Sequence, residues 1–285
     1  MTGGSVINWQ CRDRVLCVTD RPLIMGILNV TPDSFSDGGR HLDQDRAVAH
    51  GLQMAQDGAD ILDVGGESTR PGAEAVPAEE ELRRVIPVIR ALAGRAPAIL
   101  AVDTMKAEVA RAAVDAGARI INDVSALTHD AAMAAVAAAS GAGVILMHML
   151  ETPRTMQAAP HYADVVAEVA AHLAARVEAA TAQGVPRACL AVDPGIGFGK
   201  TVAHNLRLLA HLDALGRLGL PVVVGVSRKS FLGRLTGAPV QERLAASVAA
   251  LVFCVLHGAQ VVRVHDVKES RQAVEVAQAL LEARN

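Results

Sequence analysis

The sequence predicts an α/β protein, a (β/α)8 barrel of the TIM type with a short N-terminal β-hairpin. Eight short β-rich runs alternate with eight segments of helical length along the 285 residues. Several of these runs are continuously hydrophobic, as parallel strands are when helices cover both faces of their sheet. Eight strand–helix units in a chain of this size favour a single closed barrel over a doubly wound open sheet, which is the alternative.

The segment up to Pro22 precedes this repeat, and Val6–Gln10 with Val15–Val18 is expected to form a hairpin that caps the bottom of the barrel. No linker-like stretch divides the chain, so residues 1–285 are expected to form one domain with residues 1–22 as its hairpin extension. The eight strands are expected at Leu23–Leu28, Asp60–Val64, Ala98–Val102, Arg119–Asn122, Gly143–Met147, Cys189–Val192, Pro221–Val226 and Gln260–Val264.

Helices are expected between the strands, in amphipathic segments or in segments rich in alanine, which is the strongest helix former. They are expected at Gln44–Asp57, Ala78–Leu92, Lys106–Ala116, Asp130–Ala139, Ala163–Gln183, Ala203–Leu218, Val240–His257 and Lys268–Ala283. Glycine follows six of them, at the position where a helix commonly ends in the left-handed conformation. These glycines are Gly58, Gly117, Gly141, Gly184, Gly219 and Gly258.

Composition and charge exclude several classes of protein. The net charge is −3 and there is no basic block, which argues against nucleic-acid or anionic-membrane partners. Apolar runs end well before the length of about 18 residues that a membrane span needs, and no secretory signal is apparent at the N-terminus. The four cysteines lack a CxxC spacing, which favours a reduced, cytoplasmic setting. For Cys11 and Cys17, buried thiols are favoured over a disulfide across the hairpin.

Polar residues stand at the end of every predicted strand, on the face where barrel enzymes carry their chemistry. Any single Asp or Asn could instead cap the following helix, but eight such coincidences at one end of the fold point to a site. The residues are Asn29, Asp63, Asp103, Asn122 with Asp123, His148, Asp193, Ser227–Ser230, and Arg263 with His265.

The residue types predict two parts of a ligand. Asp103, Asn122 and Asp193 supply two acceptors and an amide, which suit a flat heterocycle such as a 2-amino-4-oxo pyrimidine ring, and Lys229 could donate to that ring. Two cations and an amide, Arg263, His265 and Asn29, follow strands that are neighbours in a closed barrel. Those three make a plausible phosphate site.

The loops Thr31–His41 and Gly65–Val76 are longer than usual and rich in glycine, so they are candidates for lids over the barrel mouth. The segment Gly195–Thr201 (GIGFGKT) resembles a phosphate-binding loop only at its end, because Pro194 replaces the first glycine of that motif. It also lacks a dinucleotide-binding pattern. No other histidine stands at a ligand spacing from His148, which favours a polar strand-end residue over a metal ligand.

With these residues in place, the sequence resembles the dihydropteroate synthase family of pterin-binding TIM barrels from about Leu23 to Ala283. The resemblance depends on MGILNVTPDSFSDGG, DVGGESTRPGA, VDT, INDV, LMHM, DPGIGFGK, SRKSFLG and RVHDV. These motifs lie at Met25–Gly39, Asp63–Ala73, Val102–Thr104, Ile121–Val124, Leu146–Met149, Asp193–Lys200, Ser227–Gly233 and Arg263–Val267. The turn Leu150–Thr152 departs from the family, which commonly has a small or glycine-containing turn there.

The resemblance implies a transferase of folate biosynthesis that condenses 6-hydroxymethyl-7,8-dihydropterin diphosphate with 4-aminobenzoate, and a target of sulfonamides. Family mechanisms are dissociative: diphosphate leaves first and the arylamine captures the resulting cation. The resemblance also implies Mg2+, bound with Asn29 as its contact, and a homodimer. A pterin-binding methyltransferase barrel and an inactive paralogue are the alternatives, and the intact segments Thr31–Gly39 and Ser68–Gly72 argue against the methyltransferase.

The resemblance assigns roles to individual residues of this chain. Asp103, Asp193, Lys229, Arg263 and His265 are the implied catalytic residues. The implied pterin contacts are Asp103, Asn122, Asp193, Lys229, Met147, Phe198 and Gly225. The implied diphosphate contacts are Asn29, Thr69, Arg263 and His265. The implied 4-aminobenzoate site and its loops contain Phe35, Arg70, Pro71 and Ser230, with Phe198 shared.

Overall fold

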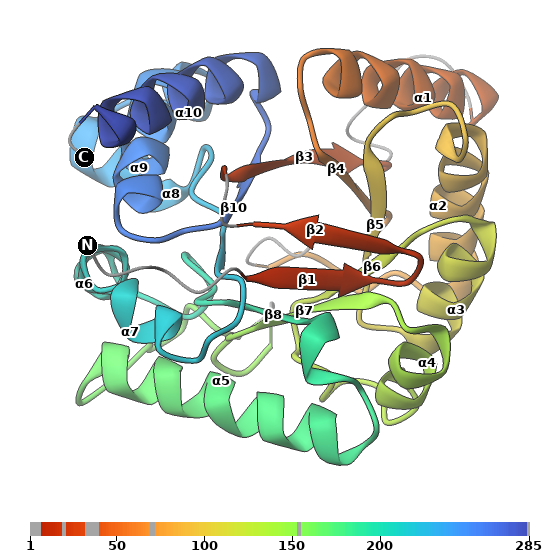
Figure 1. Ribbon diagram of the computed structural model, residues 1–285, viewed down its shortest axis with the longest axis horizontal. Coiled ribbons are helices and arrows are strands. Elements are labelled where there is room, and N and C mark those ends of the chain that lie inside the picture. Colours follow the sequence, from red (N-terminus) through yellow and green to blue (C-terminus); the bar gives the residue numbers. More distant parts are fainter. Residues whose placement is uncertain (1–6, 19–20, 32–39, 69–71, 153–154, 284–285) are drawn as a thin grey trace.

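Eight parallel strands form the centre of the protein in its computed structural model (Figure 1). The structure describes residues 7–18, 21–31, 40–68, 72–152 and 155–283. The strands pair in the order β8-β7-β6-β5-β4-β3-β10-β9, and a parallel bridge between Val192 and Val222 joins the two ends of that order. The predicted barrel is therefore confirmed. The strands are β3 (Leu23–Asn29), β4 (Ile61–Gly65), β5 (Ile99–Asp103), β6 (Ile120–Asp123), β7 (Gly143–Met147), β8 (Leu190–Asp193), β9 (Val223–Val224) and β10 (Val261–Val264).

Helices surround the barrel in the predicted alternation (Figure 1). All six glycines predicted to follow helices have a positive φ, from 64° at Gly141 to 124° at Gly117. The main helices are α1 (Arg40–Gln56), α2 (Ala78–Leu92), α3 (Ala107–Ala116), α4 (Met133–Ser140), α5 (Val165–Ala182), α6 (Val202–Ala210), α9 (Leu244–Leu256) and α10 (Val267–Glu282). Shorter elements are η2 (Arg187–Cys189), α7 (Asp213–Gly216), α8 (Ser230–Thr236) and η3 (Val240–Glu242).

Three predicted elements differ from those observed. The helix predicted at Ala203–Leu218 is divided into α6 and α7 because His211 leaves the helical region, with φ −128° and ψ 38°. The segment between the predicted strand Pro221–Val226 and the predicted helix Val240–His257 contains an additional helix, α8, which ends at Gly237 in the left-handed conformation. The seventh strand itself, β9, is shorter than Pro221–Val226, in part because proline has no N–H to donate to a strand ladder.

The predicted N-terminal hairpin is formed by β1 (Asn8–Cys11) and β2 (Arg14–Cys17), which pair antiparallel. Trp9 is fully buried, and its indole N–H donates to the Cys189 carbonyl at 2.8 Å. The Arg12 N–H donates to the Gly141 carbonyl at 2.8 Å. Both acceptors precede barrel strands, so the hairpin covers the N-terminal end of the barrel, as predicted (Figure 1).

The hydrophobic core has an inner layer inside the barrel and a larger outer layer between strands and helices. The inner layer contains Trp9 and Cys11 of the hairpin together with at least one residue from each of the eight strands. These include Met25, Ile61, Ala101, Ile120, Ile145, Ala191, Val223 and Val261. This layer fills the bottom of the barrel, so inward-facing polar residues are left at the C-terminal ends of the strands.

The four cysteines are free thiols, and Cys11 is buried, so no disulfide crosses the hairpin. Among the described residues, no helix is both long and apolar enough to cross a membrane.

Candidate active site

Three of the predicted site residues stand in one row across neighbouring strands. The register places Asn29 of β3 beside Gly65 of β4, Gly65 beside Asp103 of β5, and Asp103 beside Asn122 of β6. A Cβ atom added at Gly65 would lie 3.5 Å from the Asp103 Cβ and 3.8 Å from the Asn29 Oδ1. The side chains of Asn29 and Asp103 therefore flank the space that the missing side chain of Gly65 leaves at the barrel mouth.

A buried ion-pair network adjoins this row. Arg263 of β10 donates from Nε to Asp63 Oδ2 at 2.6 Å and from a terminal nitrogen to Asp103 Oδ2 at 2.7 Å. The Asn122 amide donates to the same Asp63 oxygen at 3.0 Å. The sequence assigned Asp103 to the heterocycle and Arg263 to phosphate, whereas the structure joins the two side chains directly. The two predicted parts of the site are therefore continuous.

Asp63 is a residue of the candidate site to which sequence reasoning gave no role. It is fully buried, and it holds both Arg263 and Asn122 through one carboxylate oxygen. Its other oxygen, Oδ1, is buried without a hydrogen-bond partner among the described residues. Its position at the end of a predicted strand could have indicated this role, because a carboxylate buried there needs a charged or hydrogen-bonding partner.

Burial shapes the electrostatics of the two other carboxylates. It raises the pKa of Asp103 to about 7, against the opposing effect of the Arg263 guanidinium. It raises the pKa of Asp193 to about 6, although the Gly195 N–H, Lys229, Arg263 and Lys200 favour the ionised form. A ligand that brings N–H donors to these oxygens would favour the carboxylates over the acids. The site is thus suited to a heterocycle rich in N–H groups.

Asp193 ends β8 beside Met147 of β7, and its Oδ1 accepts a 2.6 Å hydrogen bond from the Gly195 N–H. Gly195 has φ 65°, and a Cβ atom there would lie 1.9 Å from the His148 carbonyl oxygen, so only glycine fits. The Gly197 N–H donates to Asn205 at 2.7 Å. The segment Gly195–Thr201 therefore begins as a tight turn packed on the end of β7. Because the Gly197 N–H already donates to Asn205, it is not available to a phosphate, which agrees with the prediction that this segment is not a phosphate-binding loop.

Lys229 and Phe198 are in contact with each other. The Lys229 Nζ lies 4.2 Å from the centre of the Phe198 ring, a distance typical of a cation–π contact. Lys229 directly precedes α8, and the predicted residue Ser230 begins that helix. The cation predicted for the heterocycle and the aromatic residue predicted for both substrates therefore form one wall of the site.

His265 follows β10 and is held by a residue of the loop after β9. Its backbone N–H donates to the Ser227 Oγ at 3.2 Å, and its Nδ1 lies 3.1 Å from the same oxygen. Sequence reasoning noted Ser227 only as part of the SRKS run and gave it no role. The predicted residue Gly225 adjoins Arg263, since a Cβ atom added there would lie 3.7 Å from the Arg263 Cβ.

Four predicted residues, Phe35, Thr69, Arg70 and Pro71, lie outside the described residues. In the part of the chain that the structure describes, no group of three or more His, Cys, Asp or Glu side chains is arranged to hold a metal. His148 Nδ1 lies 2.9 Å from the Lys200 Nζ, which agrees with its interpretation as a structural strand-end residue.

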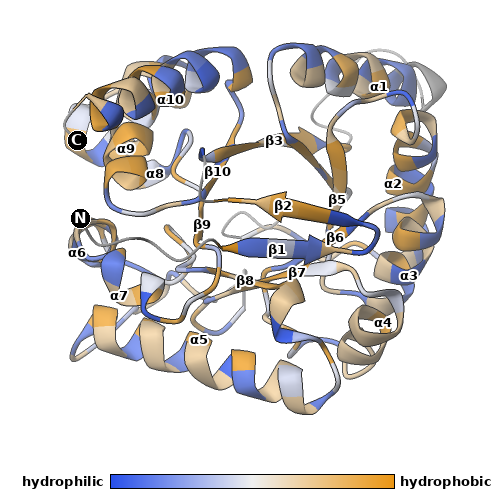
Figure 2. Cartoon of the chain, viewed as in Figure 1, coloured by the Kyte–Doolittle hydropathy of each residue, from blue (hydrophilic) through white to orange (hydrophobic). Residues whose placement is uncertain are grey.

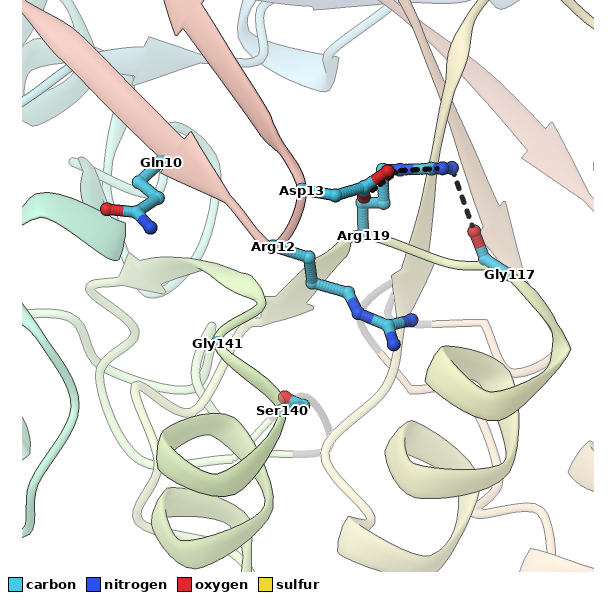
Figure 3. Close-up of a pocket in the computed structure, with 7 residues that line it drawn as sticks. All are labelled: Gln10, Arg12, Asp13, Gly117, Arg119, Ser140 and Gly141. Carbon is cyan, nitrogen blue, oxygen red and sulfur yellow. Dashed lines mark hydrogen bonds and ion pairs between the residues drawn. The ribbon is translucent and has the colours of Figure 1, made fainter.

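A cavity of about 470 Å³ lies away from these residues, at the hairpin end of the barrel (Figure 3). Its lining includes Arg12, Asp13 and Arg119, and the last two form an ion pair with a 2.7 Å N–O distance. Arg12 donates to the Val114 carbonyl, and the Arg119 guanidinium donates to Asp13. We therefore place the candidate active site at the strand ends and not in this cavity.

Comparisons with known proteins agree with this placement. The sequence matches the model of the family described as pterin binding enzyme over residues 25–265. The dihydropteroate synthase of Escherichia coli strain K12 is 49% identical over 263 residues, covering 92% of this chain and 93% of that protein.

Solved structures are equally similar. The Xanthomonas albilineans dihydropteroate synthase with 4-aminobenzoic acid superposes with a TM-score of 0.91 at 51% identity, covering 97% of this chain and 99% of the other. The enzyme from the same organism in complex with 7,8-dihydropteroate gives a TM-score of 0.87 at 49% identity, covering 96% and 98%.

Proposed function

The chain belongs to the family of pterin-binding enzymes, and from this premise we propose that it has dihydropteroate synthase activity. It condenses 6-hydroxymethyl-7,8-dihydropterin diphosphate with 4-aminobenzoate, giving 7,8-dihydropteroate and diphosphate. The observation that carries this proposal is the buried network of Asp63, Asp103, Asn122 and Arg263 at the barrel mouth. It occurs in a chain that superposes on a synthase solved with 4-aminobenzoic acid.

The buried acceptors bind the pterin in this proposal. Asp103, Asn122 and Asp193 accept from the ring N–H groups, and Met147 and Gly225 shape the space around the ring. The pterin N–H groups replace part of the solvation that these carboxylates lose on burial, so binding favours their ionised forms. Asp63 orients both Asn122 and Arg263, which makes it a positioning residue.

The bond changes need no nucleophilic side chain. The C–O bond between the pterin methylene carbon and diphosphate breaks, and diphosphate leaves with the electron pair. A C–N bond then forms between that carbon and the amine nitrogen of 4-aminobenzoate, which loses one proton. Carboxylates beside the pterin stabilise the cation that develops on it, and the Arg263 guanidinium and the His265 side chain stabilise the leaving diphosphate.

The residues present fit Mg2+ as a partner of the diphosphate. Mg2+ usually keeps several waters and binds through one or two protein oxygens together with substrate phosphates. Asn29 offers one such amide oxygen at the barrel mouth, beside Gly65, which suits a metal carried mainly by the substrate. When bound, Mg2+ would supply positive charge that stabilises the leaving diphosphate.

Two broader properties are also part of the proposal. Exposed apolar side chains on α9 and α10 support a homodimer; they include Phe253, Val276 and Leu280, which are 42%, 60% and 63% exposed. Figure 2 shows α9 as hydrophobic along most of its length. The four free thiols support a cytoplasmic enzyme, because reduced cysteines are typical of that compartment.

The first test is diphosphate release from the purified protein with both substrates and Mg2+. We expect turnover that depends on 4-aminobenzoate and that sulfonamides inhibit competitively. Asp103→Asn should weaken pterin binding by about 10- to 100-fold, since a hydrogen bond to a charged group contributes roughly 1.5–3 kcal/mol. The matched control is Asp13→Asn, which makes the same change at an exposed position of the hairpin turn.

Pterin binding without diphosphate release would contradict the proposed activity and favour an inactive paralogue. Unchanged pterin affinity in Asp103→Asn would show that Asp103 does not bind the pterin.

A further inference from the structure

The turn that follows β8 is held by two side chains of the loop after β7 and by Lys200, which directly follows the turn. Each of three consecutive carbonyl oxygens in it accepts one hydrogen bond. The Gly197 oxygen accepts from Gln157 Nε2 at 2.6 Å, the Phe198 oxygen from Lys200 Nζ at 2.9 Å and the Gly199 oxygen from Tyr162 Oη at 2.9 Å. The turn therefore has one well-defined conformation, set largely by these donors.

Lys200 is the only charged donor of the three. Its side chain is buried, with 3% exposure. Besides the Phe198 oxygen, its Nζ lies 2.9 Å from His148 Nδ1 and 3.3 Å from the His148 carbonyl oxygen. An ammonium group has three N–H bonds, and these three acceptors match them. Lys200 thus joins the turn to the end of β7.

The turn carries Phe198 and donates a hydrogen bond to Asp193, and both of these residues are implied substrate contacts. Phe198, whose carbonyl Lys200 binds, places its ring 4.2 Å from the Lys229 Nζ. Gly195 begins the same turn and donates to Asp193 at 2.6 Å. The position of the Phe198 ring, and the environment of the Asp193 carboxylate, therefore both depend on how this turn is held.

The charge of Lys200 also acts on Asp193. The cations that lower the pKa of Asp193 are Lys229, Arg263 and Lys200, in that order, against burial, which raises it. Burial and Lys229 lower the pKa of Lys200 to about 7, and Asp193 opposes them. His148 and His172 face Lys200. Burial lowers the pKa of both rings, and the Lys200 charge adds to this effect, together with Arg176 at His172.

We propose that Lys200 is a positioning residue for the synthase reaction: it holds the turn that carries Phe198 for the arylamine substrate and Gly195, the hydrogen-bond donor to Asp193, for the pterin. The inference rests on the proposed function above. Lys200 touches neither substrate; it acts through Phe198, Gly195 and Asp193. Loss of Lys200 should therefore change the KM for 4-aminobenzoate and the pH dependence of pterin binding. It should change the pterin affinity at high pH less.

Three variants test this proposal. Lys200→Met removes donors and charge, Lys200→Gln keeps N–H donors without the charge, and Tyr162→Phe removes one neutral hydrogen bond to the adjacent carbonyl. For each we would measure the KM for 4-aminobenzoate, kcat, and the affinity for the pterin diphosphate between pH 5 and 9. Wild-type turnover in the same assay tests the proposed function separately.

We expect Lys200→Met to raise the KM for 4-aminobenzoate about tenfold or more, with pterin affinity at pH 8.5 changed less than about threefold. The loss of pterin affinity on acidification should move to higher pH by about half a unit or more in both Lys200 variants, because a nearby positive charge is lost. Tyr162→Phe should not change the pH at which pterin affinity is lost on acidification, which we call the acid limb of pterin binding. If Lys200→Met does not fold, Lys200→Gln still tests the acid limb.

An unchanged acid limb in the folded Lys200 variants would overturn the proposal, as would an equal loss of both substrates in Lys200→Met. If wild-type protein releases no diphosphate, the proposed function fails, and the acid limb of pterin binding still reports on Lys200 and Asp193.

Discussion

Carboxylates are concentrated in a part of the barrel where burial opposes their charge. Asp63 is fully buried and Asp103 and Asp193 are 7% and 6% exposed. Arg263 compensates Asp63 and Asp103 through direct ion pairs, whereas Asp193 accepts a backbone N–H and has no ion pair within 4 Å among the described residues. Such a carboxylate destabilises the free protein, and we interpret it as retained for its contact with substrate.

The destabilisation caused by the buried Asp193 carboxylate should depend on pH, and the variant Asp193→Asn tests this. Folding raises the pKa of Asp193 from 3.8 to about 6. Its contribution to stability is therefore fully present below pH 3.8 and is lost as the pH rises through 6. Asparagine keeps an oxygen acceptor for Gly195 and carries no charge. We expect the variant to be more stable than wild type at pH 8, by at most about 3 kcal/mol, and to bind pterin poorly.

Thermal unfolding at pH 8 and at pH 4 measures this effect, and the stability difference should be smaller at pH 4. A variant that is less stable than wild type at pH 8 would show that the Asp193 charge is compensated in the free protein.

Among the elements, the hairpin contributes to stability and is remote from the chemistry. Trp9 fills the inner core from below, and its indole donates to the Cys189 carbonyl. We expect Trp9→Ala to lower the free energy of unfolding by about 3–5 kcal/mol, as truncation of a buried tryptophan does. At temperatures where the variant is folded, kcat/KM should stay within about twofold of wild type.

Denaturant unfolding together with the diphosphate-release assay checks this prediction. The control is Val15→Ala in β2, because Val15 is 64% exposed and its truncation should cost little. A large loss of kcat/KM in folded Trp9→Ala would show that the bottom of the barrel is coupled to the mouth.

The turn after β7, where the sequence departs from the family pattern, shows how a local conformation is kept with a different residue. Glu151 has φ 58°, the left-handed conformation that glycine adopts most readily. Leu150 packs against the next loop, since a Cβ atom at Gly199 would lie 2.5 Å from the Leu150 Cβ. The conformation expected of a glycine-containing turn is thus present, with glutamate at the left-handed position.

For the whole molecule, the proposed homodimer can be tested through two residues of α10. Val276 and Leu280 stand four residues apart and are 60% and 63% exposed. We expect wild-type protein to sediment as a dimer at micromolar concentration and Val276→Glu/Leu280→Glu to sediment as a monomer, because charge would have to be buried in the interface. A matched change at exposed Leu235 of α8 should leave the dimer intact. A monomeric wild-type protein would contradict the proposal.

Much of the molecule follows from local sequence. The alternation of hydrophobic runs with alanine-rich segments determined the barrel, and the glycines after the helices marked the ends of five of them. Polar residues at the strand ends determined which end carries the site, because the C-terminal ends of parallel barrel strands all meet at one mouth. The motifs at these positions also determined the family.

Only the tertiary structure decided which of these residues act together. Arg263 binds Asp63 and Asp103 across separations of 200 and 160 residues. That contact exists because barrel closure pairs β10 with β3, and because a long guanidinium side chain can reach the next strands. In the sequence, Lys200 belongs only to the end of an imperfect phosphate-binding motif, whereas in the structure its amine contacts three acceptors at the barrel mouth. Neither arrangement has a local periodicity, so neither could be derived from the sequence, which fixes the residues at the mouth but not their partners.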